Sequence, residues 1–259
     1  MRELGRRSYV GFASAAAIFA LMLAGCGSQG ASTGAGSVAG NAVPPVSPLT
    51  DALVPFALTP MSPIHTSPGA IIGTDNMFNP HDGDTPTGGH GATIDRKVPC
   101  LPSMGNGYHV HVFLGIVYNG TLMALPDTLG MVDPGRETNG YTNTAQCFYE
   151  IHTHDASGIV HLEMVKSLPY STVGVFKLRN VLDVWGMPRA NGQFGQFRGK
   201  MHVFVGTVAL GQTVVSSYTR YNGPIDYIPL QSHQVIWIEI GKPYYKAKQL
   251  PPVTFYMEY

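Results

Sequence analysis

The sequence is poor in charged residues: only 12% are Asp, Glu, Lys or Arg, and each sign contributes 16. The formal net charge is zero, so the excess of basic side chains that nucleic-acid binding needs is missing. Cysteine is scarce as well, with three in the chain and no Cys-x-x-Cys pair, which argues against a thiolate zinc module. The Ser-x-x-Lys motif of serine hydrolases does not occur either, and a Gly-x-Ser-x-Gly sequence occurs only at residues 30–34, within a segment of small residues and not between a predicted strand and a helix.

The N-terminus combines a basic segment with a short apolar run. Arg2, Arg6 and Arg7 precede the apolar residues 10–23, a run too short to span a bilayer comfortably. This order, followed by small residues, indicates a secretory signal. The run ends in Leu-Ala-Gly-Cys26, which resembles the lipobox of bacterial lipoproteins. The resemblance implies lipid on Cys26, cleavage before it and acylation of the new amino terminus. The alternative is an ordinary secretory signal with an incidental cysteine.

The export route and the destination are also suggested by this segment. Arg6-Arg7-Ser-Tyr-Val resembles a twin-arginine signal, but an ordinary basic segment used by the general secretory route explains it equally well. Gly27, not Asp, follows Cys26, and by the lipoprotein resemblance this favours the outer membrane if the cell has one. We therefore expect a protein of the bacterial envelope that faces the periplasm or the exterior. Its predicted partner is the lipid bilayer, reached through the acylated Cys26.

The remaining composition is typical of a β-protein rich in turns, with 31 Gly, 20 Pro and 13 Tyr. Between residues 27 and 60 the chain consists mostly of small residues and proline, and such a segment cannot bury a core. We predict a signal peptide over 1–25, a lipidated cysteine with a flexible tether over 26–60, and a single globular domain over 61–259. The last is long enough for one hydrophobic core.

A first β-hairpin is predicted from residues 108–118, YHVHVFLGIVY, in which aliphatic and other side chains alternate. The core face carries Val110, Val112, Leu114 and Ile116. His109 and His111 lie on the opposite face because successive side chains of a strand point to opposite sides. Asn119-Gly120 predicts a type I′ turn, after which the chain returns over 121–125.

A second hairpin is predicted around Asp155-Ala-Ser-Gly158, a sequence typical of turns. If His154 and Ile159 close the loop, His152 lies opposite His161 and Glu150 lies opposite Glu163. One face then carries Glu150, His152, His154, His161 and Glu163. The other face is the core side and carries Ile151, Thr153, Val160, Leu162 and Met164. A slip of one residue would bury the histidines and expose the aliphatic side chains, which disfavours that register.

These patterns place histidines on strand faces beside carboxylates, and histidine is the commonest metal-binding side chain. The predicted ligands are His109, His111, His152, His154 and His161. Further candidates, as ligands or as partners that orient them, are Glu163, Glu150, Asp155 and His202. Asp155 ranks behind the others because a carboxylate at a turn usually caps its own backbone. Such a set suits zinc, copper, iron or nickel, with copper or zinc favoured. The alternative is a polar, solvent-facing side of a sheet.

Two cysteines remain after Cys26. In an oxidising compartment Cys100 and Cys147 are expected to form a disulfide, which would close a loop of about 46 residues and contribute roughly 4 kcal/mol. Each lies just before a strand with a His-x-His pair, so the bond is expected to hold these two strands side by side. The alternative is a thiolate metal ligand.

The fold class we expect is α+β. Residues 175–185 have helical spacing, with Gly186 as the stop. Residues 200–208 and 213–217 predict a third hairpin, and it would bring His202 to the site if its strand were adjacent. The predicted architecture is a mostly antiparallel sheet with the helix on its apolar face and the histidines on its polar face. This order is similar to a β-grasp with insertions, and a β-sandwich or barrel is the alternative.

The run HTHDASGIVHLE, with the preceding His-x-His strand and the later Trp-Gly helix end, resembles a group of secreted bacterial proteins of unassigned function. The likeness covers about residues 100–190 and implies no activity. Three functions are consistent with the sequence: a lipoprotein that binds or handles metal, a periplasmic metalloenzyme of hydrolase, hydratase or oxidoreductase type, and a structural envelope lipoprotein without metal. The sequence assigns no catalytic residue.

Overall fold

The structure is a computed structural model that describes residues 58–74 and 98–256. The predicted signal peptide over 1–25, Cys26 and the tether as far as residue 57 lie outside the described residues. All described residues belong to one compact unit of the chain. Within these ranges no helix has both the length and the apolar character that crossing a membrane requires.

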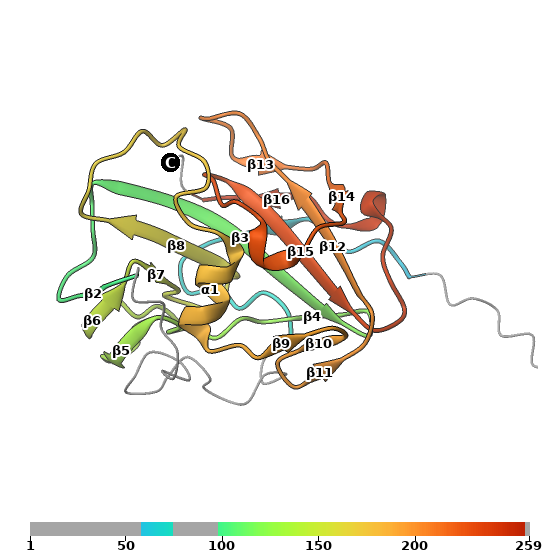
Figure 1. Ribbon diagram of the computed structural model, residues 1–259, viewed down its shortest axis with the longest axis horizontal. Coiled ribbons are helices and arrows are strands. Elements are labelled where there is room, and N and C mark those ends of the chain that lie inside the picture. Colours follow the sequence, from blue (N-terminus) through green and yellow to red (C-terminus); the bar gives the residue numbers. More distant parts are fainter. Residues whose placement is uncertain (1–57, 75–97, 257–259) are drawn as a thin grey trace, which may run out of the picture. The chain divides into compact units, whose positions relative to one another are not determined.

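A central sheet of seven strands organises the fold (Figure 1). In order across the sheet the strands are β14 (Thr219–Tyr221), β12 (Met201–Gly206), β15 (Gln234–Ile240), β3 (Tyr108–Tyr118), β8 (Ile159–Met164) and β7 (Ile151–His152), and β4 (Thr121–Met123) also pairs with β3. β15 and β3 run parallel, and all other neighbours are antiparallel. The sheet is therefore mostly antiparallel, as predicted, with one parallel pair in its middle.

Three smaller sheets and one α-helix complete the described part of the chain. The smaller sheets are β1 (Ile64–His65) with β16 (Val253–Thr254) and β13 (Val214–Val215); β2 (Cys100–Leu101) with β6 (Ala145–Tyr149) and β5 (Met131–Pro134); and β9 (Arg189–Ala190) with β10 (Gln193–Phe194) and β11 (Phe197–Arg198). The helices are α1 (Leu178–Trp185) and the short 3-10 turns η1 (Ile225–Tyr227) and η2 (Ala247–Gln249). This content agrees with the α+β class. The described strands do not close into a barrel, so the barrel alternative is wrong.

The helix α1 covers one face of the central sheet (Figure 1). Leu182 and Trp185 are completely buried there, in a hydrophobic cluster that also contains the aliphatic side chains of β3, and each such side chain stabilises the fold by about 2–3 kcal/mol. The helix ends at Gly186 with φ 70°, as predicted. It begins later than predicted because residues 174–178 run alongside residues 228–230 as extended chain, linked by backbone hydrogen bonds.

The opposite face of the sheet is not the open polar surface that the sequence predicted. Phe113 and Trp237 meet there with ring centroids 5.4 Å apart, and they belong to a second buried hydrophobic cluster. The sheet β1-β16-β13 contributes Val215 and Val253 to this cluster. β13 pairs with β16 and not with β12, so the predicted third hairpin is wrong. The histidines therefore occupy the polar end of a face that is otherwise covered and apolar.

The two other hairpins agree with the sequence. Asn119 and Gly120 both have positive φ, 49° and 81°, as a type I′ turn requires. His152 lies opposite His161, which confirms the register predicted for the second hairpin.

The disulfide between Cys100 and Cys147 is present, as predicted, and β2, which contains Cys100, pairs with β6, which contains Cys147. The two His-x-His segments are nevertheless not side by side, because β8 lies between β3 and β7. A third strand, which carries its own histidine, therefore separates the two pairs.

Candidate metal centre

Three adjacent strands bring polar side chains together at one end of the covered face. On β3 and β8, His109 lies directly opposite Glu163, and His111 lies directly opposite His161. The segment β7 adds His152 and, two residues later, His154. Because side chains two residues apart on a strand share a face, all of them point to the same side of the sheet. The five predicted histidines and Glu163 therefore meet at one place.

The ligand atoms of these side chains form two overlapping sets, and within each set all atoms lie within 4.8 Å of one another. The first set is His152, His154, His161 and Glu163, and the second is His109, His111 and His161. His109 Nε2 lies 3.2 Å from His161 Nδ1 and 3.1 Å from Glu163 Oε1. These buried groups could hold a metal ion.

Backbone carbonyl groups fix the proton position on two of the rings. His152 Nδ1 donates to the carbonyl oxygen of Tyr149 at 2.7 Å, and His154 Nδ1 donates to that of Thr142 at 2.6 Å. A carbonyl oxygen can only accept, so each neutral ring carries its proton on Nδ1 and a lone pair on Nε2. The two Nε2 atoms lie 3.2 Å apart. Metal-binding histidines typically use this hydrogen bond from the second ring nitrogen to a carbonyl.

Burial determines the charge of the cluster. His152, His161 and Glu163 expose no more than 3% of their surface. Burial lowers the pKa of His152 and His161 well below the usual range, and it lowers the pKa of His154 to about 4. These rings are therefore neutral near pH 7, the form that binds metal. Burial raises the pKa of the Glu163 carboxyl to about 7.

Aromatic side chains surround the cluster. Tyr141 stacks on His154 with ring centroids 4.7 Å apart, and Phe148 lies 5.6 Å from the ring of His152. Tyr256, near the end of the described chain, lies 6.5 Å from the ring of His111. His109 is the most exposed member, with 25% of its side-chain surface open to solvent. The cluster is therefore closed except near His109.

Three candidate residues lie outside both sets. Glu150 is half-buried at the break between β6 and β7. Asp155 instead shapes its turn, because its carboxylate accepts from the backbone N–H groups of Gly69 and Ser157 and from the Ser157 hydroxyl. His202 lies on β12, and β15 separates this strand from β3, so the ring stacks on Tyr244 rather than joining the centre.

Sequence reasoning missed Tyr141 and Tyr256, which lie in segments without strand or helix periodicity. It also missed His233, which directly precedes β15. The backbone N–H of His233 donates to the carbonyl of His111, and its Nδ1 donates to the carbonyl of Gln212. Its Nε2 is buried without a hydrogen-bond partner among the described residues. The sequence signal that could have pointed to His233 is its position directly before residues 234–240, which have a clear strand pattern.

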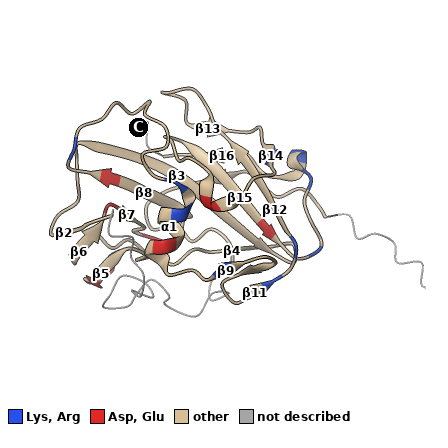
Figure 2. Cartoon of the chain, viewed as in Figure 1, with Lys and Arg blue, Asp and Glu red and all other residues tan. Residues whose placement is uncertain are grey.

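Charged side chains are sparse over the central sheet (Figure 2), and its strands carry two carboxylates, Glu163 on β8 and Glu239 on β15. Glu239 is buried, and its Oε1 accepts from the backbone N–H of Tyr245 at 2.7 Å. Burial raises the pKa of Glu239 to about 7, against the smaller opposing effects of that hydrogen bond and of Arg220. Glu239 belongs to neither ligand set, so Glu163 is the carboxylate of the centre.

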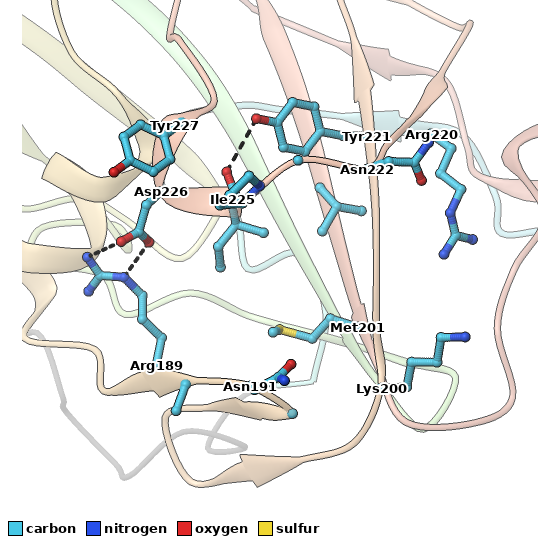
Figure 3. A pocket seen from close by; sticks show the side chains of 15 residues that line it. Arg189, Asn191, Lys200, Met201, Arg220, Tyr221, Asn222, Ile225, Asp226 and Tyr227 are labelled. Atoms are coloured by element: carbon cyan, nitrogen blue, oxygen red, sulfur yellow. Dashed lines mark hydrogen bonds and ion pairs between the residues drawn. The ribbon is translucent and has the colours of Figure 1, made fainter.

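A separate pocket of about 730 Å³ opens beside β9, the start of β12 and η1 (Figure 3). On one side Arg189 is paired with Asp226 and with Asp183, each through a nitrogen–oxygen distance of 2.6 Å. Lys200 and Arg220 lie on the side away from Arg189 (Figure 3). No predicted site residue within the described ranges lines this pocket.

The chemistry that the histidine centre supports is ligation by neutral imidazoles and one carboxylate in a closed interior. The ligand atoms come from β3, β8 and the segment at β7, so a bound ion would link three neighbouring strands. Comparison with protein-family models, curated proteins and solved structures finds no match to this chain.

Proposed function

We propose that this protein binds a transition-metal ion in the buried centre formed by β3, β7 and β8. The arrangement of His152 and His154 carries the proposal. Their Nε2 lone pairs face each other at 3.2 Å, and both protons are held on Nδ1 by carbonyl groups. Two facing lone pairs repel, and protonating either ring is unfavourable because burial opposes the charged form. A cation bound between them turns both lone pairs into ligands.

The distances between the donor atoms support this proposal. Four ligands placed about 2.1 Å from an ion at the corners of a tetrahedron lie about 3.4 Å apart. In the first set, His161 Nδ1 and Glu163 Oε1 are 3.3 Å apart, and His152 Nε2 and Glu163 Oε1 are 3.8 Å apart. Little rearrangement is therefore needed to bind an ion.

The ligand types favour copper or zinc. Imidazole suits zinc, copper, iron and nickel, whereas Mg²⁺ and Ca²⁺ need mostly oxygen ligands. No thiolate competes from the described chain, because Cys100 and Cys147 are joined in the disulfide. Copper(II) binds such sites more tightly than the other divalent first-row ions, and zinc is the common alternative.

The closed form of the centre favours retention or handling of the ion over catalysis. A catalytic metal keeps a position open for water or substrate, whereas a site enclosed by protein ligands stores the ion or stabilises the fold. A metalloenzyme is the second candidate, and the exposed part of His109 beside Glu163 supports it. In that case Glu163 is the carboxylate placed to accept a proton.

The proposed location is the bacterial envelope, with a lipid anchor on Cys26. The Leu-Ala-Gly-Cys26 sequence and the flexible segment after it support this location, and so does the disulfide, because such bonds persist in oxidising compartments. Export by either the general secretory or the twin-arginine route is compatible with this proposal.

For the core of the fold, the proposed assignment is a β-grasp with insertions. The order along the chain supports it: the neighbours β3 and β8 come first, then α1, then β12, and finally β15. β15 inserts between β3 and β12 and runs parallel to β3. A helix on one face and a parallel pair in the middle are the features that such a fold predicts.

Elemental analysis of the full-length chain, purified without chelator or histidine tag, tests the proposed function. We expect stoichiometric copper or zinc, and its loss in a His152→Phe/His154→Phe variant. His202→Phe is the matched control, because His202 is a strand histidine outside both sets, and it should retain the metal. Absence of metal, together with an unchanged melting temperature after addition of Cu²⁺ or Zn²⁺, would leave a structural lipoprotein as the better explanation.

A further inference from the structure

The donor atoms of the centre form two overlapping sets and not one. In an octahedral site with ligands at about 2.1 Å, even opposite ligands are only about 4.2 Å apart. Six donor atoms bound to one such ion would therefore all lie within 4.8 Å of one another and form a single set. The structure instead has two sets with a 4.8 Å limit, and His161 is the member they share.

Each set offers its own pair of histidines. His152 and His154 belong only to the first set, with Nε2 atoms 3.2 Å apart. His109 and His111 belong only to the second, with Nε2 atoms 2.9 Å apart. The first separation is close to the distance of about 3.4 Å between ligands of a tetrahedral ion, and the second is close to the distance of about 3.0 Å between neighbouring ligands of an octahedral ion. The two pairs lie on β3 and at β7, on either side of β8, which carries the shared residue.

Two residues lie between the pairs: Glu163, whose carboxylate can bind both ions, and His161, whose Nδ1 lone pair can bind one of them. His161 Nδ1 lies 3.2 Å from His109 Nε2 of the second pair and 3.3 Å from Glu163 Oε1. Glu163 Oε1 lies 3.1 Å from His109 Nε2 and 3.8 Å from His152 Nε2, so it is close to both pairs. A shared carboxylate offsets the repulsion between two cations, and protein sites with two metals typically hold them about 3.5–4 Å apart.

We infer that the centre holds two transition-metal ions, one at His152 and His154 and the other at His109 and His111, with Glu163 and His161 between them. The inference rests on the proposed function and adds the number of ions and the role of each strand. The ion at His109 is the one nearer solvent, because His109 is the most exposed ligand.

The number of ions is measured by titrating the metal-free full-length chain with Cu²⁺ and analysing its copper content after gel filtration. We expect two equivalents per chain. His111→Phe removes a ligand of the second pair only, and His152→Phe removes one of the first pair only. Each variant should therefore bind one equivalent. The matched control His202→Phe should bind two.

Electron paramagnetic resonance of the chain loaded with two equivalents gives a second readout, which does not depend on the folding of any variant. Two Cu²⁺ ions bridged by Glu163 should couple magnetically and give less signal than two isolated ions. Saturation at one equivalent would overturn the two-ion centre and leave the proposed function standing. Two equivalents with uncoupled spectra would place the second ion elsewhere and also overturn it. No binding would overturn both.

Discussion

Removal of the disulfide between Cys100 and Cys147 is expected to lower the free energy of unfolding by about 4 kcal/mol. The two cysteines are 47 residues apart in the sequence. In the chain-entropy relation, a closed loop of this length restricts the unfolded chain by about 14 cal/mol/K, which is about 4 kcal/mol at 25 °C. For a domain of this size, such a loss lowers the melting temperature by roughly 10 °C.

The same bond should affect metal affinity. It closes the loop that contains Thr142, and its second cysteine, Cys147, lies two residues before Tyr149. The carbonyl groups of these residues hold the Nδ1 protons of His154 and His152. If the loop loosens, the orientation of both rings is less well fixed. Loss of such supporting hydrogen bonds typically weakens metal binding by about 10-fold to 100-fold. We therefore expect the Kd for Cu²⁺ to rise by at least about tenfold in a Cys100→Ser/Cys147→Ser variant.

Guanidinium denaturation of the metal-free full-length chain measures the first effect, and calorimetric titration with Cu²⁺ measures the second. Reduction of the wild-type protein should reproduce the behaviour of the double variant. A stability loss below about 1 kcal/mol with an unchanged slope of the denaturation curve would refute the loop-entropy reasoning. Full metal affinity in the reduced protein would refute the positioning role of the loop.

Three further changes test other parts of the fold. Gly115→Ala places a Cβ 2.4 Å from the ring of Trp237, so it should lower the free energy of unfolding by about 1–3 kcal/mol, measured by denaturation. It should also alter the near-ultraviolet circular dichroism. Unchanged stability would show that the ring has room to move. Gly186→Ala forces an alanine to φ 70° at the end of α1 and should cost about 1 kcal/mol in thermal melts, whereas Gly186→Asn should cost less. Burial raises the pKa of Glu239 from 4.5 to about 7, so the folded state favours its neutral form. The stability that this preference contributes is fully present below pH 4.5 and is lost as the pH rises through 7. Glu239→Gln should therefore gain stability relative to wild type between pH 5 and pH 8, by up to about 3 kcal/mol, and an equal difference at both values would contradict a buried carboxylate that ionises in this range.

Much of the centre could be predicted from the sequence because its geometry is local. The alternation in residues 108–118 and the turn at Asp155 fix which side chains share a face. The register of His152 with His161 follows from the turn and from the aliphatic alternation that disfavours a slip. The end of α1 could also be predicted, because Gly186 in the left-handed conformation stops a helix regardless of its surroundings.

The parts that could not be predicted depend on contacts between distant segments. Nothing near His202 in the sequence shows that β15 inserts between its strand and β3, because parallel pairing has no local turn signal. Likewise, β13 is only two residues long, Val214–Val215, and such a segment carries no periodicity that would show its pairing with β16. This pairing helps to cover the face that the sequence predicts as open.

The uneven exposure of the candidate ligands has a consequence for the rate at which a metal ion would leave the proposed centre. Five of them expose 3% of their surface or less, whereas the side chain of His109 is a quarter exposed. The five are His111, His152, His154, His161 and Glu163. A competing chelator can therefore reach an ion only near His109 or after the protein opens locally. When such opening limits release, the loss of metal is first order and does not accelerate with more chelator. The residence time of a bound ion would then be set by the motion of the protein, and the ion would be retained against stronger chelators for as long as the centre stays closed.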